Sequence, residues 1–146
     1  DLAPITVLAA PTSPVFAGAV RHRDAGHAVT ALSPSDPEID WRVLLADPSV
    51  CVIVDDVEVM PDAFTDALGT AVPRCRFATS IIPMMLVPSA VSALMAVGSV
   101  LLLSPSDRSA GQVYGLNLDA GQLIRHQPGR GYLRHESRTT LVQIAR

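Results

Sequence analysis

Val50-Cys51-Val52-Ile53-Val54-Asp55-Asp56 is the stretch that decides the fold. Five apolar residues, most of them β-branched, run directly into two acids. A continuous apolar run of this length is typical of a strand buried on both faces of a parallel sheet. Acids at the carboxyl end of such a strand lie where open α/β sheets bind their ligands. A core strand followed by a solvated acidic turn is the other interpretation of the same residues.

Length and composition indicate one folded domain. The chain has 146 residues, of which 49% are hydrophobic and 17% are charged. Such a chain can bury a sizeable core, and its composition excludes intrinsic disorder. We expect a single domain over residues 1–146. Because the sequence begins at Asp1 without a signal-like segment, we expect it to belong to a larger multi-domain protein.

Charge is distributed unevenly, and all eleven Lys/Arg positions are arginine. Residues 1–73 carry three arginines against eleven acids, whereas residues 74–146 carry eight arginines against three acids. Cys51 and Cys75 form no CxxC pair and show no zinc-ligand spacing with the four histidines. Two reduced thiols of a cytoplasmic protein are favoured over a disulfide, which remains the alternative.

Apolar runs and helix-type segments alternate along the chain. Helix signals lie over 14–17, over 39–46 with Asp36 as the expected N-cap, over 63–71 and over 89–97. Strands are expected over 5–10, 27–32, 50–54, 76–82 and 100–103. Short connections between such elements predict an α/β fold with a mostly parallel sheet and flanking helices.

Residues 77–106 contain no charge, which raises the possibility of a membrane span near 81–103. Pro83, Pro88 and Gly98 interrupt this stretch, and its flanking charges are lopsided. A break at 83–88, a buried helix and a strand are therefore the preferred interpretation, and the span remains an alternative.

The last third of the chain predicts turns and a hairpin. Residues 111–115 are bounded by glycines and indicate a turn. Residues 132–134 and 140–145 read as two antiparallel strands with a turn over 135–138. We expect this C-terminal β-hairpin to extend the otherwise parallel sheet.

Three C-terminal motifs, taken with the Val50–Asp56 stretch, resemble FtsK/SpoIIIE-type P-loop ATPase domains. The motifs are Val100–Pro105, Pro128-Gly129-Arg130-Gly131 and Leu141–Ala145. The motifs and their order are similar to those in the tandem ATPase domains of actinobacterial type VII secretion motors (EccC-like proteins) and related FtsK-like proteins. The resemblance covers roughly residues 5–146 and implies a RecA/P-loop-like fold that uses ATP and Mg²⁺. It matches Val50–Asp56 to the Walker B strand.

That match gives Asp55 the role of Mg²⁺ ligand and places Asp56 where active relatives usually carry a catalytic glutamate. The chain departs from the family pattern in its phosphate-binding half. A Walker A loop, G-x-x-x-x-G-K-[ST], needs a lysine, and the chain has none. Residues 10–18 also lack its glycine spacing. The domain is therefore expected to be degenerate or truncated, and ATP and Mg²⁺ are not expected to bind this chain alone.

Arginines are the remaining candidates for a functional role. Arg74, Arg76 and Arg130 are candidates for contacts in trans with a neighbouring subunit's nucleotide or with an acidic partner. Solvated surface charge is the alternative for each. Met84, Met85, Leu86 and Met95 would supply adaptable apolar surface for a peptide ligand.

These observations predict a degenerate FtsK/SpoIIIE-like module of a translocation or secretion motor. The resemblance implies scaffolding, regulation of a neighbouring ATPase domain, or docking of a secreted protein's signal peptide, within a homo-oligomer. DNA is a second possible partner. The expected location is the cytoplasm, attached to a membrane-anchored complex. An active ATPase whose Walker A lies upstream, and a small membrane-associated protein, are the alternatives.

Overall fold

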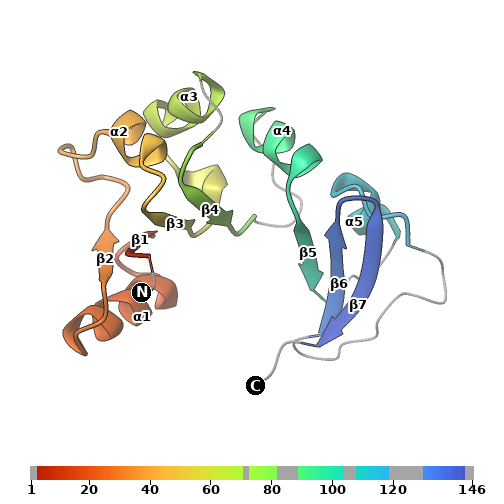
Figure 1. The fold of residues 1–146 in the computed structure, drawn as a ribbon, viewed down its shortest axis with the longest axis horizontal. Helices are drawn as coiled ribbons and strands as arrows, with labels where there is room; N and C mark the ends of the chain where they lie inside the picture. Colours follow the sequence, from red (N-terminus) through yellow and green to blue (C-terminus); the bar gives the residue numbers. More distant parts are fainter. Residues whose placement is uncertain (1–2, 71–72, 82–88, 104–107, 119–129, 144–146) are drawn as a thin grey trace. The chain divides into compact units, whose positions relative to one another are not determined.

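The computed structural model describes residues 3–70, 73–81, 89–103, 108–118 and 130–143 (Figure 1). They fall into two compact units, Asp1–Ala90 and Val91–Arg146. The first unit contains a parallel sheet and the second contains an antiparallel sheet. The predicted α/β class is therefore confirmed.

The first unit alternates strands and helices in the expected order. Its strands form one parallel sheet in the order β2-β1-β3-β4. The elements are β1 (Ile5–Leu8), α1 (Pro14–Asp24), β2 (Val29–Leu32), α2 (Trp41–Ala46), β3 (Cys51–Val54), the 3₁₀ turn η1 (Val57–Val59), α3 (Asp62–Thr70) and β4 (Arg76–Thr79). The stretch Val50–Asp56 contains the inner strand β3, which pairs with both β1 and β4.

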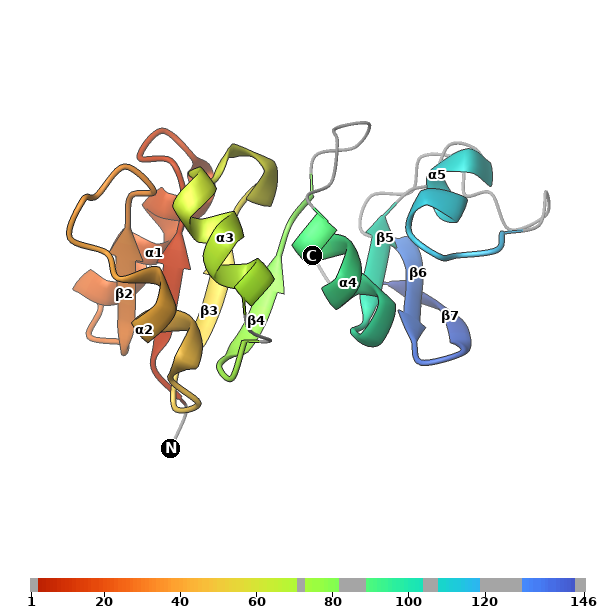
Figure 2. The ribbon, with the colours of Figure 1, turned by 90° about the horizontal axis from the view of Figure 1, so that it is seen from above.

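Helices cover both faces of this sheet. In Figures 1 and 2, α1 lies on one face, and α2 and α3 lie together on the other. Within the sheet, β2 is the neighbour of β1 on one side, and β3 is its neighbour on the other side. The chain therefore changes direction across the sheet between β2 and β3. The carboxyl ends of β1 and β3 therefore flank the topological switch point, where open α/β sheets bind ligands.

Aromatic packing fills the face beneath α2 and α3. The Phe64 side chain of α3 is fully buried. Its ring centroid lies 5.4 Å from that of Trp41 in an edge-on arrangement and 6.4 Å from that of Phe77, to which it is nearly parallel. Val52 and Val54 of β3 are fully buried as well. The opposite face packs smaller residues, Val7, Ala9 and Ala19, against Phe16 of α1.

Capping residues set the helix starts, and one expectation needs correction. The helical turn predicted over 14–17 is confirmed but is longer, an eleven-residue helix, and the Ser13 side chain accepts the Val15 N–H while Pro14 occupies the first turn. Asp36 is not the N-cap of α2. Its carboxylate accepts the Glu38 N–H within a turn, whereas Asp40 accepts the N–H groups at 42 and 43.

The second unit is built around a three-stranded antiparallel sheet in the order β5-β6-β7. It contains most of α4 (Ser89–Val97), β5 (Val100–Leu103), α5 (Arg108–Val113), β6 (Arg130–His135) and β7 (Arg138–Gln143). The C-terminal hairpin is confirmed. It belongs to a separate sheet, because β6 pairs with β5, and the expectation that it extends the parallel sheet is wrong. The turn expected over 111–115 is wrong at its start, since α5 runs through Val113.

The described residues contain no helix that is long and apolar enough to cross a membrane. Within the stretch 81–103, the helix α4 has nine residues and is followed by β5. A spanning helix needs about 20 residues.

Replacing Phe64 with alanine is expected to lower the unfolding free energy by about 3–5 kcal/mol, since it removes a fully buried ring and leaves a cavity. Denaturant unfolding followed by Trp41 fluorescence measures the loss. Val43→Ala on α2, where the side chain is 66% exposed, is the control and should change stability by less than about 0.5 kcal/mol. Equal effects of the two variants would contradict the packing described.

Gly131→Ala is expected to destabilise the antiparallel sheet. A Cβ at this position would lie 2.3 Å from the carbonyl oxygen of Leu102 on the paired strand, so the two backbones would have to separate. Near-UV circular dichroism of the two tyrosines, Tyr114 and Tyr132, reports on this unit. Gly18→Ala in the interior of α1 has room for its methyl group and should instead stabilise by up to about 1 kcal/mol. A neutral Gly131→Ala would contradict the strand register.

Candidate functional site

Asp55 joins the carboxyl ends of three strands. It directly follows β3, and its backbone N–H donates to the carbonyl of Leu8 at the end of β1, at 2.9 Å. One carboxylate oxygen, Oδ2, accepts the Ser13 hydroxyl at 2.5 Å, and the other, Oδ1, lies 3.2 Å from the Ser80 hydroxyl. Ser13 follows β1 and Ser80 follows β4, so polar groups from three neighbouring strands converge on this carboxylate.

Ser80 also holds the second acid in place. Its hydroxyl accepts the Asp56 N–H at 2.7 Å and lies 3.0 Å from the Asp56 Oδ1. A hydroxyl has one proton, so Ser80 donates either to Asp55 or to Asp56 at any moment. The two carboxylates therefore share a single donor at the end of β4.

The backbone of Asp56 lies in the left-handed region, with φ 54° and ψ 76°. A residue with a Cβ adopts this conformation at a cost of order 1–3 kcal/mol and does so mainly where the surroundings enforce it. Here the hydrogen bonds of Ser80 fix both its amide and its carboxylate. Strained positions of this kind gather at functional sites, which makes Asp56 a candidate beside Asp55.

Oxygen donors dominate the site. Two carboxylates and two hydroxyls are the hard ligands that Mg²⁺ accepts, and Mg²⁺ usually takes one or two carboxylates together with phosphates and water. Among the described residues, no group of three or more His, Cys, Asp and Glu side chains is arranged to hold a metal. The residues fit a Mg²⁺ ion that arrives with a phosphate ligand better than a metal held by protein groups alone.

The loop after β1 contains no phosphate-binding features of the Walker type. It runs through Ala9, Ala10, Pro11 and Thr12 to Ser13 and has neither glycine nor lysine. The Ser13 N–H is already donated to the Ala10 carbonyl in a turn. The Ser13 hydroxyl is engaged twice, as acceptor for the Val15 N–H and as donor to Asp55.

Two of the arginines that the sequence indicated, Arg74 and Arg76, lie at the amino ends of the strands in the same sheet. Arg76 begins β4 and Arg74 precedes it, so both lie at the amino end of that strand, whereas Asp55 follows the carboxyl end of β3. Their side chains are exposed. Within one molecule they are thus separated from the two acids by the length of the sheet.

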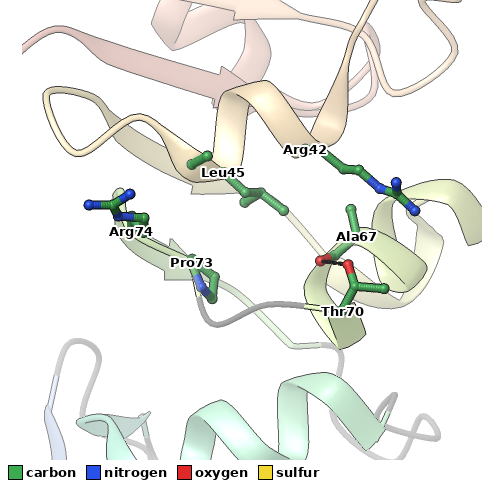
Figure 3. Close-up of a pocket in the computed structure, with 7 residues that line it drawn as sticks. Arg42, Leu45, Ala67, Thr70, Pro73 and Arg74 are labelled. Atoms are coloured by element: carbon green, nitrogen blue, oxygen red, sulfur yellow. Dashed lines mark hydrogen bonds between the residues drawn. The ribbon is translucent and has the colours of Figure 1, made fainter.

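Arg74 lines a cavity of about 370 Å³ between α2, α3 and the segment before β4 (Figure 3). Its walls are mainly apolar, from Leu45, Ala67 and Pro73. Figure 3 shows the guanidinium groups of Arg42 and Arg74 at opposite ends of this cavity, pointing away from one another. Neither side chain forms an ion pair with any of the described residues.

Other sequence candidates are distributed differently. Arg130 begins β6 in the second unit, is half-buried and is already engaged in an interaction. Met95 is half-buried on α4. Met84, Met85 and Leu86 lie outside the described residues, as do the Pro128-Gly129 part of the Pro-Gly-Arg-Gly motif and Ile144–Ala145 of the last motif.

Both cysteines are free thiols, as favoured from the sequence. Cys75 is buried before β4, and burial raises the pKa of its thiol. A raised pKa keeps the group protonated and unreactive at neutral pH, so Cys75 serves as an apolar core residue.

Ser13 and Ser80 were not predicted from the sequence as members of the site. Ser13 follows the strand predicted over 5–10, whereas Ser80 lies inside the strand predicted over 76–82. Parallel strands bring their carboxyl ends to one edge of a sheet, so a search for polar residues after those ends would have found Ser13. Ser80 is reached only because β4 ends at Thr79, earlier than predicted.

Comparison of the chain with protein-family models, with curated proteins and with solved structures finds no match.

Ser80→Ala is expected to lower the unfolding free energy by about 1 kcal/mol, because it removes the acceptor of the Asp56 N–H and the shared donor of two carboxylates. Ser35→Ala is the matched control, since Ser35 is exposed and its hydroxyl contacts the nearby hydroxyl of Ser33. Denaturant unfolding compares the two. If Ser80→Ala were as stable as Ser35→Ala, the hydrogen bonds of Ser80 to the two acids would not stabilise the site.

Proposed function

We propose that this chain is an FtsK/SpoIIIE-like ATPase module of a translocation or secretion motor, degenerate in its nucleotide site. Its role is scaffolding, regulation of a neighbouring ATPase domain, or docking of a substrate signal. The observation that carries the proposal is Asp55, an acid at the carboxyl end of an inner parallel strand and beside the switch point. A Walker B acid, which helps to hold Mg²⁺, ends a strand of this kind.

The same residues support loss of the catalytic function in this chain. Asp55 and Asp56 could meet a Mg²⁺ ion brought by a nucleotide, which would supply charge neutralisation at the phosphates. The chain offers no lysine to reach those phosphates. Asp55 accepts the Ser13 hydroxyl and shares the Ser80 hydroxyl with Asp56, and Asp56 is one methylene shorter than the glutamate of active relatives.

Docking is the role that the cavity beside Arg74 supports. An apolar side chain of a secreted protein's signal segment would fill the space lined by Leu45, Ala67 and Pro73. Acidic residues on either side of that anchor would meet Arg42 and Arg74 at the two ends. In this proposal the module works on the cytoplasmic side of a membrane-anchored motor and contacts the other ATPase domains of the assembly.

A second candidate is the Walker B half of an active ATPase whose Walker A segment lies upstream. The outer strand β4 favours it, because among the described residues β4 pairs on one side only, with β3. A further strand added parallel to β4 would place the loop at its carboxyl end beside Ser80. A phosphate-binding loop there would lie next to Asp55 and Asp56.

Titration calorimetry with Mg·ATP separates the two candidates. The 146-residue chain is expected to show no binding heat, because it has no lysine for a Walker A loop. The same chain extended upstream within its natural protein should also show none if the site is degenerate. Binding in the extended form, abolished by Asp55→Asn, would replace the first candidate with the second.

Asp62→Asn is the control in the extended form. Asp62 lies in the first turn of α3 and is not among the hydrogen-bonding groups of the site. It removes the same charge and should leave any binding unchanged. Mg·ATP binding by the unextended chain would contradict both candidates.

A further inference from the structure

Two histidines meet where α1 ends. His22 lies in the last turn of this helix, and His27 lies two residues before β2 begins. Their ring centroids are 5.4 Å apart, and the ring planes are inclined to one another by 59°. Both residues are exposed. The pair lies in the first unit, outside the group formed by Asp55 and the two serines, and the proposed function does not use it.

The backbone between the two histidines is fixed by hydrogen bonds. The His27 N–H donates to the His22 carbonyl at 3.1 Å, which joins the two residues directly. Gly26 has a φ of 85°, the left-handed conformation that glycine commonly adopts after a helix, and its N–H donates to the Arg23 carbonyl at 2.9 Å. The helix end therefore sets the separation of the two histidines, and only their side chains have to rotate to share a ligand.

The distance between the rings suits a shared metal ion. Imidazole nitrogen is a common ligand of Zn²⁺, Ni²⁺ and Cu²⁺. With Zn–N bonds of about 2.0–2.1 Å and tetrahedral angles, two imidazoles on one Zn²⁺ have ring centres about 5 Å apart. The observed 5.4 Å is close to this value. Among the described residues, neither ring takes part in a hydrogen bond or an ion pair that a metal would have to break.

Charges around the pair permit a cation. The last carbonyl groups of a helix carry partial negative charge, which favours a positive ion at its end. The Arg23 guanidinium forms an ion pair with the adjacent Asp24 carboxylate at 3.0 Å. The Arg21 guanidinium extends back along the helix, where a Cβ on Gly18 would lie 3.8 Å from it. The positive charges of α1 are thus partly neutralised or directed away from the helix end.

We propose that His22 and His27 bind one divalent transition-metal ion of the zinc type, through one ring nitrogen of each residue. Within the part of the chain that the structure describes, no group of three or more His, Cys, Asp and Glu side chains is placed to hold a metal, so water fills the other coordination positions. The bound ion would link the last turn of α1 to the start of β2. The proposal is independent of the proposed function, because Mg²⁺ prefers oxygen ligands and would not use these two nitrogens.

Titration calorimetry of the full chain with ZnCl₂ tests the proposal. One Zn²⁺ is expected to bind per chain, and Cu²⁺ is expected to bind more tightly, as the general order of divalent-metal affinities requires. In NMR spectra, the imidazole nitrogen signals of His22 and His27 should shift together as Zn²⁺ is added, and MgCl₂ should leave them unchanged. Absence of Zn²⁺ binding, or binding that leaves both sets of signals unchanged, would overturn the proposal.

Single substitutions locate the ion. His22→Ala and His27→Ala should each weaken Zn²⁺ binding by about 100-fold, because the second imidazole acts as an intramolecular ligand. Both positions are exposed, so far-UV circular dichroism should show an unchanged fold. His135→Ala is the matched control, since it removes a histidine that contacts Ser99 in the second unit, and it should bind Zn²⁺ like the parent chain. Parent-like affinity in either α1 variant, or loss of binding in His135→Ala, would place the ion elsewhere and overturn the assignment.

Discussion

The hydrogen bond between the Ser13 hydroxyl and the Asp55 carboxylate holds the site of the first unit together. It joins two segments 42 residues apart in sequence, at the point where the chain changes direction across the sheet. Ser13 also caps the start of α1, and Asp55 directly follows β3. One contact therefore fixes both the start of α1, on one face of the sheet, and the end of β3, which leads to α3 on the other face.

The burial and fixed register of β3 explain why Asp55 lies beside Ser13. The apolar stretch of β3 forms bonds to β1 and β4 and faces helices on both sides, so its register leaves little freedom. Its first polar residue must emerge at the carboxyl edge, beside the ends of its two neighbours. The hydroxyls of Ser13 and Ser80 satisfy the emerging carboxylate, and Asp56 accepts a left-handed backbone to turn into η1. The acids are thus a consequence of sheet geometry as well as candidates for function.

The sequence allowed the parallel α/β unit, the strand β3, the helix α4 and the hairpin to be predicted, because each has a clear periodicity or a capping residue. It did not allow the partner of the hairpin to be predicted, since β5 is an apolar run that suits parallel or antiparallel pairing equally well. The prediction of the α2 start was wrong because Asp36 and Asp40 are both good capping residues. In the structure, Asp40 caps the helix and Asp36 lies in the preceding turn. Asp55 and Asp56 were candidates from the sequence, whereas Ser13 and Ser80 come close to them through pairing between distant strands.

A double-mutant cycle between Ser13 and Asp55 tests the central claim most directly. Ser13→Ala, Asp55→Ala and the double variant are unfolded in denaturant beside the parent chain, and the cycle cancels the separate loss of the α1 cap. A coupling free energy of about 1 kcal/mol or more is the predicted result, as expected for a hydrogen bond to a charged group. Additive losses would show that the two residues do not interact and would contradict the proposed joining of β1 and β3 at the switch point.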